Sequence, residues 1–209
     1  MTVQGLIDSL SVRFADPDKT MWSDQELLVY VNQGTRCVHQ LLVARNDPLV
    51  LSVGELSTVE GVSSYELPAG FLAMYTGSGV DRTGVWIGSS YLQPCKPDRS
   101  ADYSLSSGGE PKEYYLTPTS VVLLPTPDDT YTVSYAYFTA LDDLALTDNM
   151  PFQDLFNDAI GEYVCAKARL RGEMDATAAM LVYNELERRA LNMVAVRTPV
   201  RPRMRLRRR

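Results

Sequence analysis

The sequence predicts an α+β fold: a helical bundle of two N-terminal and two C-terminal helices, with an inserted antiparallel β subdomain and an extended basic C-terminal arm. Apolar residues recur at helical spacing near both ends of the chain, which predicts the bundle. Residues 47–146 are instead rich in glycine, proline, serine and tyrosine, and their apolar runs have strand length. Residues 197–209 hold seven arginines and no acidic residue, which predicts the arm.

These observations divide the chain into four segments. We expect the N-terminal helices of the bundle in 1–46, the β insertion in 47–146, the C-terminal helical hairpin in 147–196 and the arm in 197–209. A chain of 209 residues, 45% of them hydrophobic, can bury a sizeable core. Neither a signal peptide nor an apolar run of membrane-spanning length is recognisable, so we expect a soluble protein made in a cytoplasm.

The first two helices are predicted by their apolar spacing and by one capping signal. The first should cover 2–14, where valine, leucine and isoleucine recur every three or four residues. The second should begin after Ser23, which forms a capping box with Glu26, and should end near Arg45. Its buried stripe is expected to consist of Leu27, Leu28, Val31, Val38, Leu41 and Leu42.

The β insertion is expected to consist of short strands joined by turns. Its clearest part is a predicted hairpin, in which Val121–Leu124 and Thr130–Phe138 flank the turn 125–129. Alternate side chains of a strand share a face, which places Tyr131, Val133, Tyr135 and Tyr137 together. The polar stretch between Pro97 and Pro111 is expected to be a mobile loop.

Helical spacing returns after Pro151 and predicts two further helices that lie antiparallel, because only a short connection around Gly172 separates them. The first should bury one stripe, formed by Phe152, Leu155, Phe156, Ala159, Ile160, Tyr163 and Leu170. The second should bury Met174, Ala178, Leu181, Val182 and Leu186.

The arm combines alternation with charge. From Val200 to Arg207 apolar residues alternate with arginines, so an extended arm has one apolar edge and one cationic edge. Pro199 and Pro202 disfavour a regular helix there. We interpret the arm as a docking strand, disordered when free and laid along another chain when bound, although a solvated terminus or a tail that contacts DNA phosphates also fits. The candidate partner-binding residues are Arg197, Arg201, Arg203, Arg205, Arg207, Arg208 and Arg209.

The rest of the chain is strongly acidic. Residues 1–196 hold 13 Lys+Arg against 26 Asp+Glu, so a body of net charge −13 carries an arm of charge +7. Such asymmetry indicates an acidic or polyanionic partner for the arm, while the acidity of the body alone also serves solubility.

Residues with the spacing of known catalytic or metal sites are not evident. The chain has one histidine, His39, which lies beside a helical apolar stripe and fits a structural role. Its three cysteines are far apart and are expected to be reduced thiols. The pairs Asp128-Asp129 and Asp142-Asp143 fit turns and caps better than catalysis. We therefore expect no enzyme activity, no cofactor and no metal.

Several local strings resemble those of tailed-phage head-to-tail adaptor proteins, also called head-completion or connector proteins. They are 21–28 (Met-Trp-Ser-Asp-Gln-Glu-Leu-Leu) followed by Tyr30 and Asn32, then 65–68 (Tyr-Glu-Leu-Pro) with Phe71, and 146–148 (Leu-Thr-Asp) before the helix at Pro151. The resemblance covers the body from Thr2 to about Val196. The β insertion is larger than the one in minimal helical adaptors.

The resemblance implies a structural virion protein at the head-to-tail junction of a bacteriophage, made in the host cytoplasm. It implies a homo-oligomeric ring, usually a dodecamer, that joins the portal protein to the tail nozzle or tail-tube proteins around a DNA channel. Genomic DNA would pass through this channel, and no membrane would be involved. The C-terminal segment of such adaptors commonly reaches the portal, so residues 197–209 become the candidate portal-docking arm.

Overall fold

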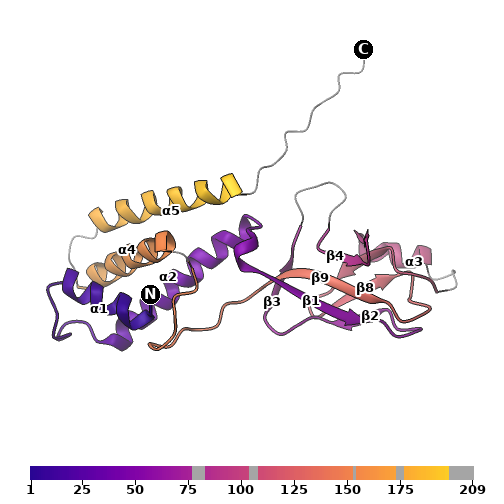
Figure 1. Cartoon of the computed structure of the whole chain (residues 1–209), viewed down its shortest axis with the longest axis horizontal. Coiled ribbons are helices and arrows are strands. Elements are labelled where there is room, and N and C mark those ends of the chain that lie inside the picture. The colour runs from indigo at the N-terminus through magenta and orange to yellow at the C-terminus, as the bar shows by residue number, and fades with distance from the viewer. Residues whose placement is uncertain (77–82, 104–107, 153, 173–176, 198–209) are drawn as a thin grey trace, which may run out of the picture. The chain divides into compact units, whose positions relative to one another are not determined.

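The computed structural model describes residues 1–76, 83–103, 108–152, 154–172 and 177–197 (Figure 1). The chain divides into two compact units. The first is helical and combines Met1–Arg45 with the chain from Leu141 onward, and the second is the β unit Asn46–Ala140. The α+β class expected from the sequence is therefore confirmed, while residues 198–209 of the arm lie outside the described residues.

The helical unit contains the four expected helices: α1 (Val3–Arg13), α2 (Asp24–Ala44), α4 (Asp154–Arg171) and α5 (Thr177–Arg197). Helix α4 packs against α1, α2 and α5. Helices α4 and α5 lie side by side and run in opposite directions (Figure 1), as the sequence predicts. The central helix α4 thus joins the N-terminal and C-terminal parts of the unit.

The two N-terminal helices begin at side-chain caps. The Thr2 hydroxyl accepts a hydrogen bond from the Gly5 amide and caps α1. The predicted capping box of Ser23 and Glu26 is present at the start of α2. The predicted stripe of α2 is confirmed for Leu27, Val31, Val38 and Leu42, which are buried, while Leu28 and Leu41 are half-buried.

Helices α2 and α4 approach each other closely at Gly34. A Cβ atom built there would lie 3.0 Å from the Tyr163 ring and 3.3 Å from Cγ2 of Ile160. Ile160, Phe156 and Ala159 are buried as expected. The small residue therefore sets the distance between the two helices.

The predicted faces of α4 and α5 are partly wrong. Leu170 is 58% exposed, and Leu181 and Val182 are 65% and 45% exposed. On α5 it is the Tyr183 ring that contacts α4, with its centroid 5.6 Å from that of Tyr163, so Leu181 and Val182 turn away from α4. At the end of α4, Arg171 rather than Leu170 lies over Trp22.

The β unit contains two sheets. One has the order β1 (Leu51–Ser57), β9 (Thr132–Thr139), β4 (Val85–Ile87) and β5 (Ser90–Tyr91), and β3 (Phe71–Met74) also pairs with β9. The other has the order β2 (Ser64–Glu66), β8 (Ser120–Leu124), β7 (Glu113–Leu116) and β6 (Gln93–Pro94). Pairing is antiparallel except between β6 and β7, which are parallel, so the wholly antiparallel expectation is corrected at this edge.

The predicted hairpin is wrong, because β8 and β9 belong to different sheets. The segment 125–129 crosses from one sheet to the other. It is bound to neighbouring loops, since the carbonyls of Thr126 and Pro127 accept hydrogen bonds from the amides of Gly109 and Gly61. The stretch after Pro97, expected to be a loop, contains two short helices, η2 (Pro97–Arg99) and α3 (Ser100–Tyr103); another, η1 (Pro48–Val50), precedes β1.

The core of the β unit is formed by side chains from both sheets. Val133, Tyr135 and Tyr137 of β9 contribute to it, in agreement with their predicted common face, whereas Tyr131, predicted on the same face, precedes β9 and is not part of this core. The buried members of this core are Met74, Val85, Leu92, Tyr114, Val121, Leu123, Val133 and Tyr135.

Candidate assembly surfaces

The residues predicted to bind a partner lie at the C-terminus. Arg197 is the last residue of α5. The other six, Arg201, Arg203, Arg205, Arg207, Arg208 and Arg209, lie outside the described residues. The surfaces described below therefore come from the body of the protein.

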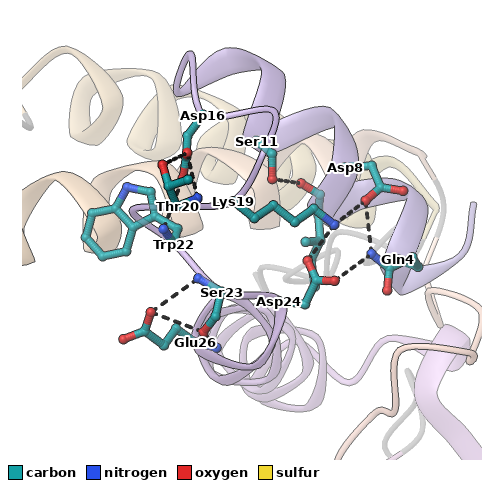
Figure 2. A network of polar contacts seen from close by, with 11 residues as sticks. Gln4, Asp8, Ser11, Asp16, Lys19, Thr20, Trp22, Ser23, Asp24 and Glu26 are labelled. Carbon is teal, nitrogen blue, oxygen red and sulfur yellow. Dashed lines mark hydrogen bonds and ion pairs between the residues drawn. The ribbon is translucent and has the colours of Figure 1, made fainter.

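A polar cluster holds the connection between α1 and α2 (Figure 2). The buried Asp16 carboxylate accepts four hydrogen bonds: from the Thr20 amide and hydroxyl, at 2.8 and 2.7 Å, and from the amides of Met21 and Trp22, at 2.8 and 3.0 Å. Burial by itself would raise the pKa of Asp16, but these hydrogen bonds lower it below its ordinary value. Asp16 thus fixes the turn that leads into α2.

Lys19 joins the middle of α1 to the beginning of α2. Its ammonium group lies 2.7 Å from the Asp8 carboxylate on α1 and 2.6 Å from that of Asp24 on α2. The Gln4 amide also donates to both carboxylates (Figure 2). The hydrogen bond from Lys19, followed by that from Gln4, lowers the pKa of Asp8. Because these groups pair with one another across the two helices, the cluster forms a structural junction between α1 and α2.

Residues 21–28, one of the strings that resemble phage adaptors, also connect α2 to the end of α4. Glu26 pairs with Arg171, and this hydrogen bond, followed by those from Ser23, lowers the pKa of the Glu26 carboxyl. The Arg171 guanidinium lies 5.7 Å from the centroid of the Trp22 ring. The string 21–28 therefore serves to position helices.

Asn32 binds the chain where it returns from the β unit. Its Nδ2 donates to the Leu144 carbonyl at 3.1 Å, and its Oδ1 accepts from the Leu144 amide at 2.8 Å. The amides of Val3 and Gln4 donate to the carbonyls of Asp148 and Leu146, so the start of α1 is bound to the same returning segment. This role of Asn32 was not predicted, although a polar residue between Val31 and Gly34 on a buried helix face is a signal that the sequence contains.

The string 65–68 belongs to the β unit. The Tyr65 hydroxyl donates to the Val62 carbonyl at 2.6 Å and accepts from the Val59 amide, which closes the loop after β1. Leu67 and Phe71 pack against the core. Beside them lies an open groove of about 400 Å³, lined by Glu66, Leu67, Pro68, Gly70, Phe71, Pro118 and Thr119.

A comparison with protein-family models decides the identity. The model described as SU10 adaptor protein matches residues 1–207. The chain belongs to the SU10 adaptor protein family. The family consists of phage structural adaptors, so this adaptor is a bacteriophage virion component that associates with portal and tail components. No curated protein matches the chain.

Three polar groups of the adaptor that could in principle take part in chemistry are buried or have a structural partner. His39 is buried, and this burial lowers its pKa. Asp128 accepts from the Tyr131 hydroxyl and raises the pKa of Tyr131 to about 12. Asp143 pairs with Arg36. Within the residues that the structure describes, histidine, cysteine and acidic side chains form no group of three or more suited to a metal ion.

The described helices of the adaptor also lack a membrane-spanning candidate, since none of them is both long and apolar enough. Their exposed apolar side chains are scattered over several elements. Val12 on α1, Leu170 on α4 and Leu181 on α5 are each more than half exposed. Single exposed apolar residues of this kind are ordinary on a protein surface and do not by themselves mark an interface.

Proposed function

We propose that this SU10 adaptor forms a ring, a dodecamer, that joins the portal to the tail and lines the channel for genomic DNA. Its arm, residues 197–209, docks on the portal. The observation that carries the proposal is the family match over residues 1–207, because it spans both units and continues into the arm.

The distribution of charge supports a division of labour. The β unit, residues 46–140, holds 4 Lys+Arg against 11 Asp+Glu, and the helical unit without the arm is also acidic. An acidic channel wall repels phosphates and lets DNA slide. Arginine forks in the arm suit bidentate contacts to carboxylates of the portal.

Exposed apolar side chains on two helices are available for contacts in the proposed ring. A ring of identical subunits needs two different faces in contact, since its interfaces are heterologous. Val12 on α1 and Leu181 on α5 lie on helices at opposite ends of the sequence, and both are exposed. Weak contacts of single subunits then add up through the avidity of the closed ring.

The test mixes purified portal with the full-length adaptor and with a chain truncated after Val196. The full-length chain should form a ring complex visible by electron microscopy, and the truncated chain should bind much more weakly. A matched control replaces the seven arm arginines by lysine, which keeps the charge but removes the bidentate geometry. Equal binding by the truncated chain would remove the arm from the mechanism.

Direct DNA binding by the arm is the second candidate, and the seven arginines favour it. If all seven paired with duplex phosphates, log K would fall with log salt at a slope of roughly −6. Undetectable binding to DNA at low salt would reject this candidate and leave portal docking in place.

A further inference from the structure

Most sheet edges of the β unit are blunted. Strands β5 and β6 contain only two residues each, and β6 ends in Pro94. Strand β2 has three residues, and the pairing of β3 with β9 is irregular between Phe71 and Ala73. Short strands, prolines and bulges are the devices by which proteins prevent unwanted pairing at a sheet edge.

Strand β1 lacks all of these devices. It has seven residues, pairs with β9 in a continuous register from Leu51 to Ser57, and contains neither lysine, arginine nor proline. Among the described residues β9 is its only strand partner, so the other edge of β1 is unpaired. Val53 is 64% exposed on this edge strand. An edge of this kind recruits an extended segment from another chain.

The two faces of β1 differ in chemistry. Gly54 and Leu56 lie opposite Tyr135 and Val133, which belong to the core, so this part of the face is apolar, while Ser52 lies on the same face. The Tyr135 ring lies over Gly54, where a Cβ would come within 2.7 Å of it. Val53 and Glu55 lie on the other face, and the exposed Glu55 has no ion pair among the described residues.

Residues 200–206 match this edge in length, alternation and charge. The segment has seven residues, as β1 does, which is about 23 Å for an extended strand. One parity of the segment is apolar and suits the face with Leu56, while the other is arginine and suits the face with Glu55. Pro202 is one of the apolar positions of the segment. When the arginine positions direct their N–H and C=O groups toward β1, the position of Pro202 points away from β1, so no hydrogen bond is lost because proline lacks an N–H.

We propose that residues 200–206 of one copy add as a strand to the free edge of β1 in a neighbouring copy. The proposal rests on the proposed ring for the presence of a neighbour. The added strand brings the proline and the cations that β1 lacks, and it therefore ends the sheet and prevents further growth. Arg207, Arg208 and Arg209 follow the added strand, so the portal-docking part of the arm narrows to these three arginines.

The test measures hydrogen exchange by mass spectrometry in peptides from β1 and β9 of the assembled full-length adaptor. One variant keeps the composition of residues 200–207 but places the four arginines first, which destroys the alternation. A second is Val53→Lys, which places a charge on the edge. The matched control is Val59→Lys, because Val59 is similarly exposed, at 57%, but lies outside the strand.

Exchange in β1 should be slow in the native chain and in Val59→Lys, and at least about tenfold faster in the other two variants. Hydrogen exchange in β9 should be the same in the native chain and in all three variants. Equal protection of β1 by the rearranged arm would overturn strand addition whatever the portal result. If the native arm protects β1 while the chain truncated after Val196 binds portal normally, portal docking fails and strand addition stands.

A photo-crosslinking side chain at Ser57, at the end of β1, tests the donor of the strand. In a mixture of isotopically heavy and light adaptor, it should join heavy chains to the C-terminal residues of light chains. Crosslinks found only within single chains, or only to segments other than the C-terminal residues, would overturn strand addition between neighbouring copies.

Discussion

Replacing Asn32 by alanine should open the helical unit where the chain returns from the β unit. The variant loses both hydrogen bonds to Leu144 and leaves the Leu144 amide and carbonyl without partners. Two net hydrogen bonds contribute about 2 kcal/mol, and incomplete solvation of the half-buried Leu144 groups adds roughly 1 kcal/mol. The higher helix propensity of alanine offsets about 0.5 kcal/mol of this loss in the free energy of unfolding. We expect a loss of about 2–3 kcal/mol in the free energy of unfolding.

The assay is urea unfolding followed by the fluorescence of Trp22, which is buried in the helical unit, in a Trp86→Phe background that removes the tryptophan of the β unit. The matched control is Gln40→Ala on the same helix, because Gln40 is exposed and gains the same helix propensity. Its stability should be unchanged or slightly higher. A loss below about 0.5 kcal/mol in Asn32→Ala would refute the assigned role of the two hydrogen bonds.

Three further predictions concern single positions. Gly84→Ala should destabilise the β unit by about 2 kcal/mol or more in urea unfolding, because its Cβ would lie 2.3 Å from the Tyr75 carbonyl oxygen and 2.8 Å from that of Ala136, and main-chain atoms yield little. The pKa of Asp16 is lowered in the fold, so its stabilisation is present above about pH 4 and is lost as the pH falls through the lowered value. Asp16→Asn should therefore be less stable than the native chain at pH 7 but approach it near pH 2 in urea titrations, and a constant difference would contradict this. Leu181→Lys should leave the melting temperature unchanged because Leu181 is exposed, whereas Tyr183→Ala should lower it by removing the contact with Tyr163; the opposite ranking would restore the face predicted from the sequence.

Local signals in the sequence were sufficient for the four helices of the helical unit, but not for the short helices η1, η2 and α3. The caps at Thr2 and Ser23 depend on residues three positions apart, and apolar spacing identified the buried side of α2. The predicted hairpin at 125–129 was wrong because strand pairing depends on segments that are distant in the sequence. Strand β8 pairs with β2 and β7, whereas β9 pairs with β1, β3 and β4. The face of α5 was wrong because its apolar residues surround much of the helix, and the contact of Tyr183 with Tyr163 decides its rotation.

The strings that resemble phage adaptors identified the family, and within them the sequence revealed the capping role of Ser23 and Glu26 but not the role of Asn32. Ser23, Glu26 and Asn32 form caps and tertiary hydrogen bonds, and no spacing rule pairs Asn32 with Leu144 across the whole insertion. The free edge of β1 was equally invisible in the sequence, because the strand order must be known before an edge can be recognised.

The pairing of β1 with β9 has a consequence for the order of folding. These strands follow the entrance and precede the exit of the β unit, and partners such as Leu51 and Phe138 are about 5 Å apart in an antiparallel pair. If the β unit were unfolded, bringing α2 and α4 together would close a long flexible loop, and the entropic cost of that closure grows with the logarithm of the loop length. Once β1 and β9 have paired, the loop between the two helices is effectively short and this cost is small. A β unit that folds early therefore lowers the entropic cost of bringing α2 and α4 together. A substitution that disrupts the pairing of β1 with β9 should lower the stability of the helical unit even where no helical residue is altered.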